Sequence, residues 1–220
     1  MDSPPDAGVA VGRIGLSRLH FPVTTLGPGT RAGIWVQGCS IHCPGCLSRD
    51  TWAPAAALTA TGEVVDWVES LAGEGLAGIT VSGGEPLDQS APLRELLADL
   101  RARPALTRLD ILLYTGYAYG VVARRHPAVL DLVDAVVSGP YAGSRPSTHP
   151  WMGSGNQVLT LLTQRARERF VPSPGPRQLQ VSADGGTMWI TGIPGPGDLE
   201  RLQSLLEERG VLLGDVSWRP

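Results

Sequence analysis

The sequence predicts an α/β fold made of parallel β/α units, with a β-hairpin and a helix added at the C-terminus. Through residues 13–162, short apolar runs alternate with segments of helical periodicity, which is typical of parallel β/α units and not of an all-β protein. In the last third of the chain, two strand-like runs follow one another directly before a single helical segment. The 220 residues, 42% hydrophobic and 18% charged, suffice for one well-buried domain with a small appendage.

Strands are expected where short apolar runs are bounded by turn residues. The run at 32–37, Ala-Gly-Ile-Trp-Val-Gln, is expected to be a buried strand that leads into a loop containing all the cysteines. An Asp-Gly pair at 184–185 is a strong hairpin signal between the last two strands. The other expected strands are 13–23, 79–81, 109–114, 135–137, 158–162, 179–181 and 188–191.

Helices are expected at 62–72 and 91–102, where apolar residues recur at spacings of three and four. Thr61 and Ser90 stand directly before these segments, and hydroxyl side chains are good N-caps. Further helices are expected at 119–125, 128–132 and 198–208.

The chain is expected to divide into a disordered lead-in at 1–10, a core at 11–162 and a C-terminal extension at 163–220 packed on that core. A long connection at 139–156 is rich in Gly, Ser and Pro. Loops of more than about 12–15 residues inside a compact domain are usually functional or disordered, and the Trp-Met-Gly-Ser-Gly-Asn-Gln stretch at 151–157 favours a functional loop.

The three cysteines of the chain, Cys39, Cys43 and Cys46, stand within eight residues in a C-x₃-C-x₂-C pattern. Four cysteines are the usual complement of a [4Fe–4S] cluster, so three would leave one iron open. An open metal position is typical of catalytic sites. The alternative is a zinc site completed by His42 or His20, although structural zinc favours two separate ligand pairs and this chain has no second pair.

A second motif, Ser-Gly-Gly-Glu-Pro at 82–86, follows the expected strand at 79–81. Glycines at a strand end allow the backbone to approach a ligand closely, because they have no Cβ atom. The exposed backbone groups and the Glu85 carboxylate could together bind a zwitterionic amino acid. The alternative interpretation is an ordinary turn between a strand and a helix.

Composition excludes several functions. All 18 basic residues are arginine, which rules out Schiff-base chemistry and a P-loop with its lysine. The formal net charge of −3 gives no reason to expect nucleic acid or an anionic membrane as a partner. The N-terminus lacks signal-peptide features, and no apolar run approaches the ~20 residues of a membrane span. Clustered cysteines are typical of proteins in a reducing compartment. We therefore expect a cytoplasmic protein.

The cysteine and glycine motifs together resemble those of the radical S-adenosylmethionine (SAM) superfamily. The resemblance implies a partial (β/α)₆-type barrel, open on one side, with the cysteines on the loop after the first core strand. It also implies that the amino and carboxylate groups of SAM chelate the open iron, and that reductive cleavage of SAM gives a 5′-deoxyadenosyl radical. The SAM contacts that it implies are Gly45, Leu47, Gly83, Gly84, Glu85, Pro86 and Thr115.

Residues 27–52 are similar to the activating enzymes of glycyl-radical proteins. GPGTR at 27–31 and RDTW at 49–52 resemble the pyruvate formate-lyase activases, whereas 43–46, 114–117 and 151–157 resemble the activators of anaerobic ribonucleotide reductase more closely. Within the first motif, Arg31 is expected either to close a salt bridge or to support the cluster. Leu47 departs from the pattern, because activases commonly carry Tyr or His there.

The resemblance implies that the substrate is a backbone glycine of a partner glycyl-radical enzyme, which would plug the open side of the barrel. It also implies an electron donor such as flavodoxin or ferredoxin. The alternatives are a radical SAM enzyme that modifies a ribosomal peptide or a natural-product intermediate, and a non-catalytic iron–sulfur or zinc module.

Overall fold

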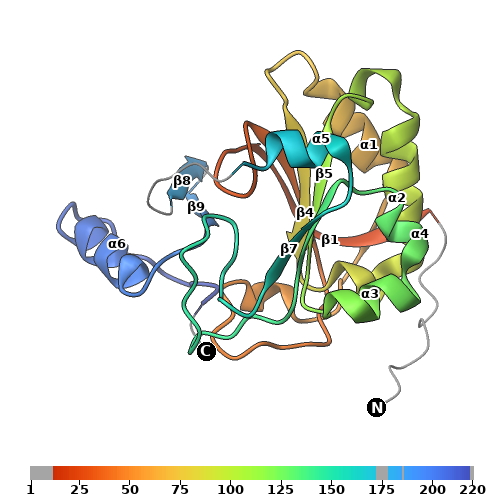
Figure 1. Cartoon of the computed structure of the whole chain (residues 1–220). Helices are drawn as coiled ribbons and strands as arrows, with labels where there is room; N and C mark the ends of the chain where they lie inside the picture. The colour runs from red at the N-terminus through yellow and green to blue at the C-terminus, as the bar shows by residue number, and fades with distance from the viewer. Residues whose placement is uncertain (1–11, 172–177, 185, 219–220) are drawn as a thin grey trace.

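A computed structural model describes residues 12–171, 178–184 and 186–218 (Figure 1). The predicted lead-in at 1–10 and Gly185 of the predicted hairpin turn lie outside the described residues. The strands are β1 (Arg13–Val23), β2 (Arg31–Val36), β3 (Leu58–Ala60), β4 (Gly78–Gly83), β5 (Asp110–Thr115), β6 (Ala135–Ser138), β7 (Val158–Leu161), β8 (Leu179–Asp184) and β9 (Thr187–Gly192). The helices are α1 (Thr61–Ser70), α2 (Ser90–Ala102), α3 (Tyr119–Arg125), α4 (Pro127–Leu130), α5 (Gln164–Arg169) and α6 (Asp198–Glu207), with short 3₁₀ helices η1 (Arg49–Thr51), η2 (Pro86–Gln89) and η3 (Pro104–Leu106).

The central sheet has seven strands in the order β3-β1-β2-β4-β5-β6-β7. The middle strands β2, β4, β5 and β6 are parallel, whereas β1 is antiparallel to both of its neighbours and β7 is antiparallel to β6. The predicted mixed α/β fold with parallel β/α units is therefore confirmed. The described strands form no closed barrel, and antiparallel strands flank the parallel ones on both sides, so the six-unit partial barrel is not confirmed.

Helices α1 to α4 cover one face of the sheet (Figure 1). Alternate residues of the parallel strands point to this face, among them Ile34, Ile79 and Ile111, and they pack against buried side chains such as Val64 of α1 and Leu96 of α2. This layer forms the main hydrophobic core and fixes where the strands end. The amphipathic helices predicted at 62–72 and 91–102 are thereby confirmed as α1 and α2.

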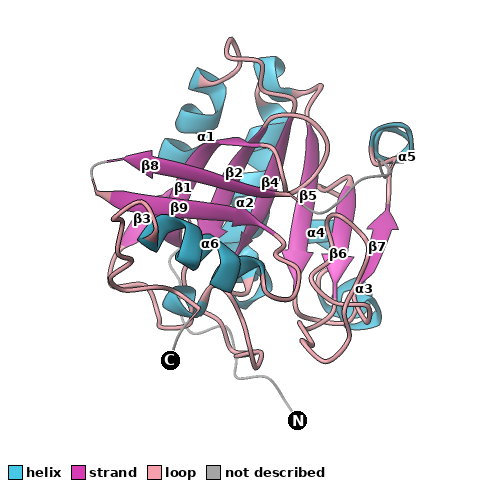
Figure 2. Cartoon of the chain, turned by 90° about the vertical axis from the view of Figure 1, so that its left-hand side faces the viewer, coloured by secondary structure: helices cyan, strands magenta, loops and turns pink. Residues whose placement is uncertain are grey.

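The C-terminal hairpin β8–β9 and helix α6 lie on the other face of the sheet (Figures 1 and 2). In Figure 2 they lie in front of the β1, β2 and β3 end of the sheet. Ile193, just after β9, packs with Trp35 of β2 and with Val23 and Leu26. A separate cluster around Trp151 and Phe170 covers the β5–β6–β7 end. The predicted C-terminal hairpin and helix are confirmed; α5, whose Ala166 packs in the second cluster, was not predicted.

A buried ion pair closes the N-terminal edge of the parallel strands. Arg31, the first residue of β2, is fully buried; it donates to Asp110 Oδ1 at 2.6 Å and to Thr80 Oγ1 at 2.7 Å. Arg169 Nε lies 2.8 Å from the other oxygen of Asp110. Because the cysteine loop follows the opposite end of β2, the salt-bridge interpretation of Arg31 is correct and the expected support of the cluster is wrong.

Two predicted helix caps are also wrong. Thr61 is the first residue of α1, and its hydroxyl donates to Gly12 O instead of accepting from the helix. Ser90 likewise lies inside α2. The three-residue strand β3, which pairs with β1 along Arg13–Gly15, is too short to give a periodic signal. Among the described residues, no helix combines the length and the apolar character needed to cross a membrane.

Candidate functional site

The cysteine loop, residues 37–47, leaves the C-terminal end of β2 and is held mainly by backbone hydrogen bonds. Gly38 N donates to Thr51 O at 2.8 Å, and Cys39 N donates to Trp52 O at 3.2 Å. Cys46 N donates to Cys43 O at 3.0 Å, which closes a four-residue turn. Its third residue, Gly45, has a φ of 76°, so proline followed by glycine is the pair that a type II turn favours. The local sequence thus fixes how the second and third thiols are presented.

The three thiols are free, half-buried and line one cavity of about 1050 Å³. Burial raises the pKa of the Cys39 and Cys43 thiols, and a bound metal would oppose this shift because thiolates are the ligands. Within the described ranges, no three His, Cys, Asp or Glu side chains converge on a single-ion site. A cubane does not require such convergence, since each thiolate binds a different iron. The donor set therefore fits an iron–sulfur cluster better than zinc.

Both histidines named as a fourth zinc ligand have contacts of their own in the fold. The His42 ring stacks on Trp52, with 4.6 Å between the ring centroids. His20 Nε2 lies 3.2 Å from Ser182 Oγ on β8. These contacts give each imidazole a role in packing or hydrogen bonding that does not depend on a metal.

The Ser-Gly-Gly-Glu-Pro loop at 82–86 lies directly against the cysteine loop. Gly84 N donates to Val36 O at 2.9 Å, and Glu85 N donates to Gly38 O at 2.8 Å. A Cβ atom on Gly84 would overlap the Gly38 carbonyl, and one on Gly83, whose φ is 111°, would overlap the backbone of Val36. Glycine is therefore required here for contact between two backbones, while Gly83 and Gly84 also line the cavity.

The Glu85 carboxylate is buried and fully engaged. Its Oε1 accepts from Leu87 N at 2.9 Å and from the Thr115 hydroxyl at 2.8 Å, and its Oε2 accepts from Gly116 N at 2.7 Å. Burial raises the pKa of Glu85 to about 7. These contacts join the glycine loop to the end of β5. The side chain therefore positions the loop.

Asp88 of η2 links the cysteine loop to the segment that follows β5. Its carboxylate accepts from Ser40 N at 2.7 Å, from Ser40 Oγ at 3.0 Å and from Tyr117 OH at 2.8 Å. Sequence reasoning missed Asp88, because no motif named it and its partners lie on two distant segments. The only prior signal was Tyr117, which belongs to the 114–117 segment of the family resemblance.

The predicted SAM contacts do not all lie at the cavity. Leu47, Gly83, Gly84, Glu85 and Thr115 line it, whereas Gly45 and Pro86 do not. Gly45 stands at the exposed apex of the cysteine turn, and Pro86 is buried as the first residue of η2. The role of all seven in binding a cofactor stays a prediction.

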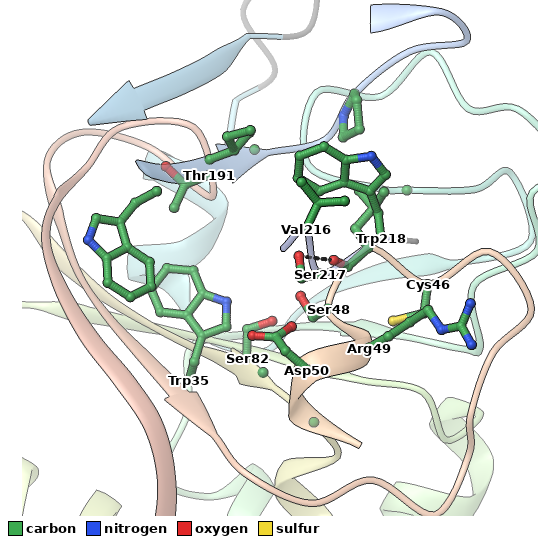
Figure 3. Close-up of a pocket in the computed structure, with 18 of the residues that line it drawn as sticks. Trp35, Cys46, Ser48, Arg49, Asp50, Ser82, Thr191, Val216, Ser217 and Trp218 are labelled. Carbon is green, nitrogen blue, oxygen red and sulfur yellow. Dashed lines mark hydrogen bonds between the residues drawn. The ribbon is translucent and has the colours of Figure 1, made fainter. Parts of the chain in front are cut away.

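The C-terminal extension supplies a wall of this cavity, which sequence reasoning did not foresee. The whole of β9 and the tail at 211–218 line it, beside the cysteine loop. Ser217 Oγ donates to Leu47 O at 2.7 Å, and Arg49 N donates to Ser217 O at 3.2 Å. Figure 3 shows Ser217 between Trp218 and the segment with Ser48 and Arg49. The tail is thus fastened to the loop that carries the thiols.

Arg18 of β1 links the hairpin to the sheet across the cavity. Its guanidinium lies over the Trp35 ring at 5.2 Å and over the Trp189 ring at 5.4 Å, measured to the centroids. Its Nη1 is 3.1 Å from Asp50 Oδ2. Cation–π contacts of this kind stabilise by about 0.5–2 kcal/mol each, depending on exposure. Arg18 therefore helps to hold β9 in place as a wall.

Comparison with known proteins agrees with this geometry. Residues 25–160 match the family described as "4Fe-4S single cluster domain". The anaerobic ribonucleoside-triphosphate reductase-activating protein of Enterobacteria phage T4 is 32% identical over 136 residues, which cover 60% of this chain and 85% of that protein. The protein of the same name from Escherichia coli K12 is 31% identical over 147 residues, 64% of this chain and 94% of that protein. More than a third of this chain lies outside each of these alignments.

Proposed function

This chain belongs to the 4Fe-4S single-cluster family and to the activating proteins of anaerobic ribonucleoside-triphosphate reductase, and from that premise we propose that it is a radical SAM activase. In this proposal it cleaves SAM reductively and abstracts hydrogen from a glycine of a partner glycyl-radical enzyme, in the cytoplasm. The observation that carries the proposal is that three thiols, with no fourth cysteine in the chain, share one cavity with the Ser-Gly-Gly-Glu segment at 82–85.

Cys39, Cys43 and Cys46 would hold the [4Fe–4S] cluster, each thiolate binding one iron. The cluster, when bound, supplies the electron that splits SAM into methionine and the 5′-deoxyadenosyl radical. The chain's contribution is to hold the cysteine loop still. The Val36–Gly84 and Gly38–Glu85 backbone hydrogen bonds do this from one side, and the Ser217–Leu47 hydrogen bond does it from the other.

The backbone of Gly83 and Gly84, with Leu47 and Thr115, would form the SAM site, because these residues line the cavity beside the thiols. Glu85 would act on SAM through the loop that it positions. The cavity walls would exclude water from a reactive radical, which protects it from side reactions. Electrons would come from a small donor protein such as flavodoxin or ferredoxin.

A second candidate is a radical SAM enzyme that modifies a peptide or a natural-product intermediate. One observation favours it: β9 and the tail at 211–218 already wall the cavity. A partner protein is then not needed to cover this side of the site, in contrast to the expectation from the sequence. The two candidates share the cofactors and differ only in the molecule from which hydrogen is taken.

The test is to reconstitute the full chain anaerobically, reduce it, add SAM and measure iron, zinc and 5′-deoxyadenosine. We expect about four irons per chain, no zinc and formation of 5′-deoxyadenosine. Cys43→Ala should abolish the product. His42→Asn is the matched control, because His42 has a φ of 50° and asparagine tolerates this left-handed conformation. Binding of one zinc per chain would contradict the proposal. So would the loss of 5′-deoxyadenosine formation in His42→Asn.

A further inference from the structure

Strand β9 presents a free edge to the cavity. Every residue from 186 to 194 lines the cavity, and none of the described residues of β8 does. Across the described strands, β9 pairs with β8 alone, in the register Gln180↔Thr191 and Val181↔Ile190. In an antiparallel pair, alternate residues direct their N–H and C=O groups away from the partner strand. A row of backbone donors and acceptors therefore borders the cavity, and such an edge is a template for another strand.

A buried hydroxyl on the same strand also lacks a partner. Thr191 is 5% exposed, lines the cavity, and its Oγ1 has no hydrogen-bond partner among the described residues. Side chains alternate along a strand, so Thr191 shares a face with Trp189, which stacks on Arg18, and with Ile193, which packs near Trp35. Figure 3 shows Thr191 and Trp35 on the same side of the pocket. Buried polar groups are nearly always paired, and this hydroxyl, unlike the equally unpaired one of Thr25, lines a cavity from which a ligand can reach it.

The cavity is at the upper limit of size for a site that holds one small molecule. Sites for one small molecule usually measure about 300–1,000 Å³, and this one measures about 1050 Å³. The tail at 211–218, which Ser217 fastens to the cysteine loop, also lines the cavity. An extended chain segment between β9 and this tail would lie beside the three thiols.

We infer that an extended segment of a partner polypeptide binds by pairing with the free edge of β9, and that its side chain opposite Thr191 hydrogen-bonds to the Thr191 hydroxyl. Strand addition of this kind draws affinity from backbone hydrogen bonds and specificity from side-chain pockets. That the segment carries the hydrogen to be abstracted rests on the proposed function. Strand β9 belongs to the extension at 163–220, all of which lies beyond the 25–160 family match.

The test uses a displayed library of random ten-residue peptides with a central glycine, selected on the reconstituted full chain. Enriched peptides are resynthesised with fluorescein, and their Kd is measured by anisotropy against the wild type, Thr191→Val and Thr25→Val. Thr25 is the matched control, because its hydroxyl is also buried and unpaired but does not line the cavity. We expect Thr191→Val to raise the Kd roughly 2- to 10-fold, the loss of one neutral hydrogen bond, and Thr25→Val to leave it unchanged.

N-methylation of the peptide backbone tests the strand pairing itself. Methylation at alternate amides should abolish binding, and methylation at the intervening amides should not, because only every second amide faces β9. Failure to enrich any peptide, equal effects of the two threonine variants, or indifference to N-methylation would each overturn the inference. Formation of 5′-deoxyadenosine without peptide is measured in parallel. Its absence beside normal peptide binding would refute the proposed chemistry and leave the β9 subsite standing.

Discussion

Replacing Glu85 with glutamine should change how the stability of the protein depends on pH. The carboxylate is buried and accepts three hydrogen bonds, from Leu87 N, the Thr115 hydroxyl and Gly116 N. Burial nevertheless dominates and raises its pKa from 4.5 to about 7. Glutamine has nearly the same shape but does not titrate, so the substitution removes the titration and keeps the oxygen that faces Thr115.

The sign and size of the effect follow from linkage. Between pH 4.5 and 7 the folded protein keeps a proton on Glu85 that the unfolded chain has lost, so the free energy of unfolding falls as the pH rises. The contribution is fully present below pH 4.5 and is lost by the time the pH passes 7. At about 1.4 kcal/mol per pH unit, the whole change is on the order of 3 kcal/mol.

The assay is urea denaturation of the cluster-free full chain and of Glu85→Gln at intervals between pH 4.5 and 7.5. The measured quantity is the difference in unfolding free energy between the two proteins. Burial lowers the pKa of His20 and His149, which therefore also titrate, but they do so equally in both proteins and cancel. The amide nitrogen facing Gly116 N–H adds a nearly constant cost of about 1–3 kcal/mol to the variant.

We expect the stability advantage of the wild type over Glu85→Gln to shrink steadily as the pH rises across this range. A difference that stays flat to within about 0.5 kcal/mol, the usual scatter of independent effects, would refute the reasoning. It would mean that Glu85 titrates normally and that water reaches its carboxylate. The hydrogen-bonded link between the glycine loop and β5 would then be looser than the structure shows.

Two further substitutions test the packing of the glycine loop against the cysteine loop and the buried ion pair at the N-terminal edge of the parallel strands. Gly84→Ala should lower the iron content of the reconstituted protein, because its methyl group would overlap the backbone just before Cys39; Gly62→Ala, in open space on α1, should leave it unchanged. Asp110→Ala should reduce the urea-derived unfolding free energy by about 3–5 kcal/mol, since it leaves Arg31 charged and buried without its partner. The exposed ion pair of Asp66 provides the control, and its removal should cost less than about 1 kcal/mol.

Much of the architecture was predictable because it depends on local patterns. The alternation of apolar runs with helical periodicity gave the β/α units of the core, and the helix predicted at 119–125 matches α3 residue for residue. Proline and glycine between Cys43 and Cys46 indicate a tight turn, because they prefer the φ values that a type II turn needs. The cysteine and glycine motifs were likewise recognisable before their contacts were known.

Long-range contacts were not predictable in the same way. Thr61 and Ser90 had the chemistry of N-caps, but Thr61 instead donates to Gly12 O, a group 49 residues away in sequence. Arg31 belongs to a motif that stands close to the cysteines in sequence, yet its partner Asp110 is 79 residues further along the chain, and the two meet at the edge of the sheet opposite to the cysteine loop. Residue type indicates what a side chain can bind, and only the fold determines what it meets.

The sequence by itself determined the donor set: three thiols on a tight turn, a glycine-rich loop after a strand, and no lysine. Spacing along the chain is enough to bring the three thiols together, because they stand within eight residues. Only the tertiary structure decided that the extension walls the cavity, since the Ser217–Leu47 hydrogen bond joins residues 170 positions apart. It also decided that β9 keeps a free edge there, because strand pairing depends on which segments the packed core leaves adjacent.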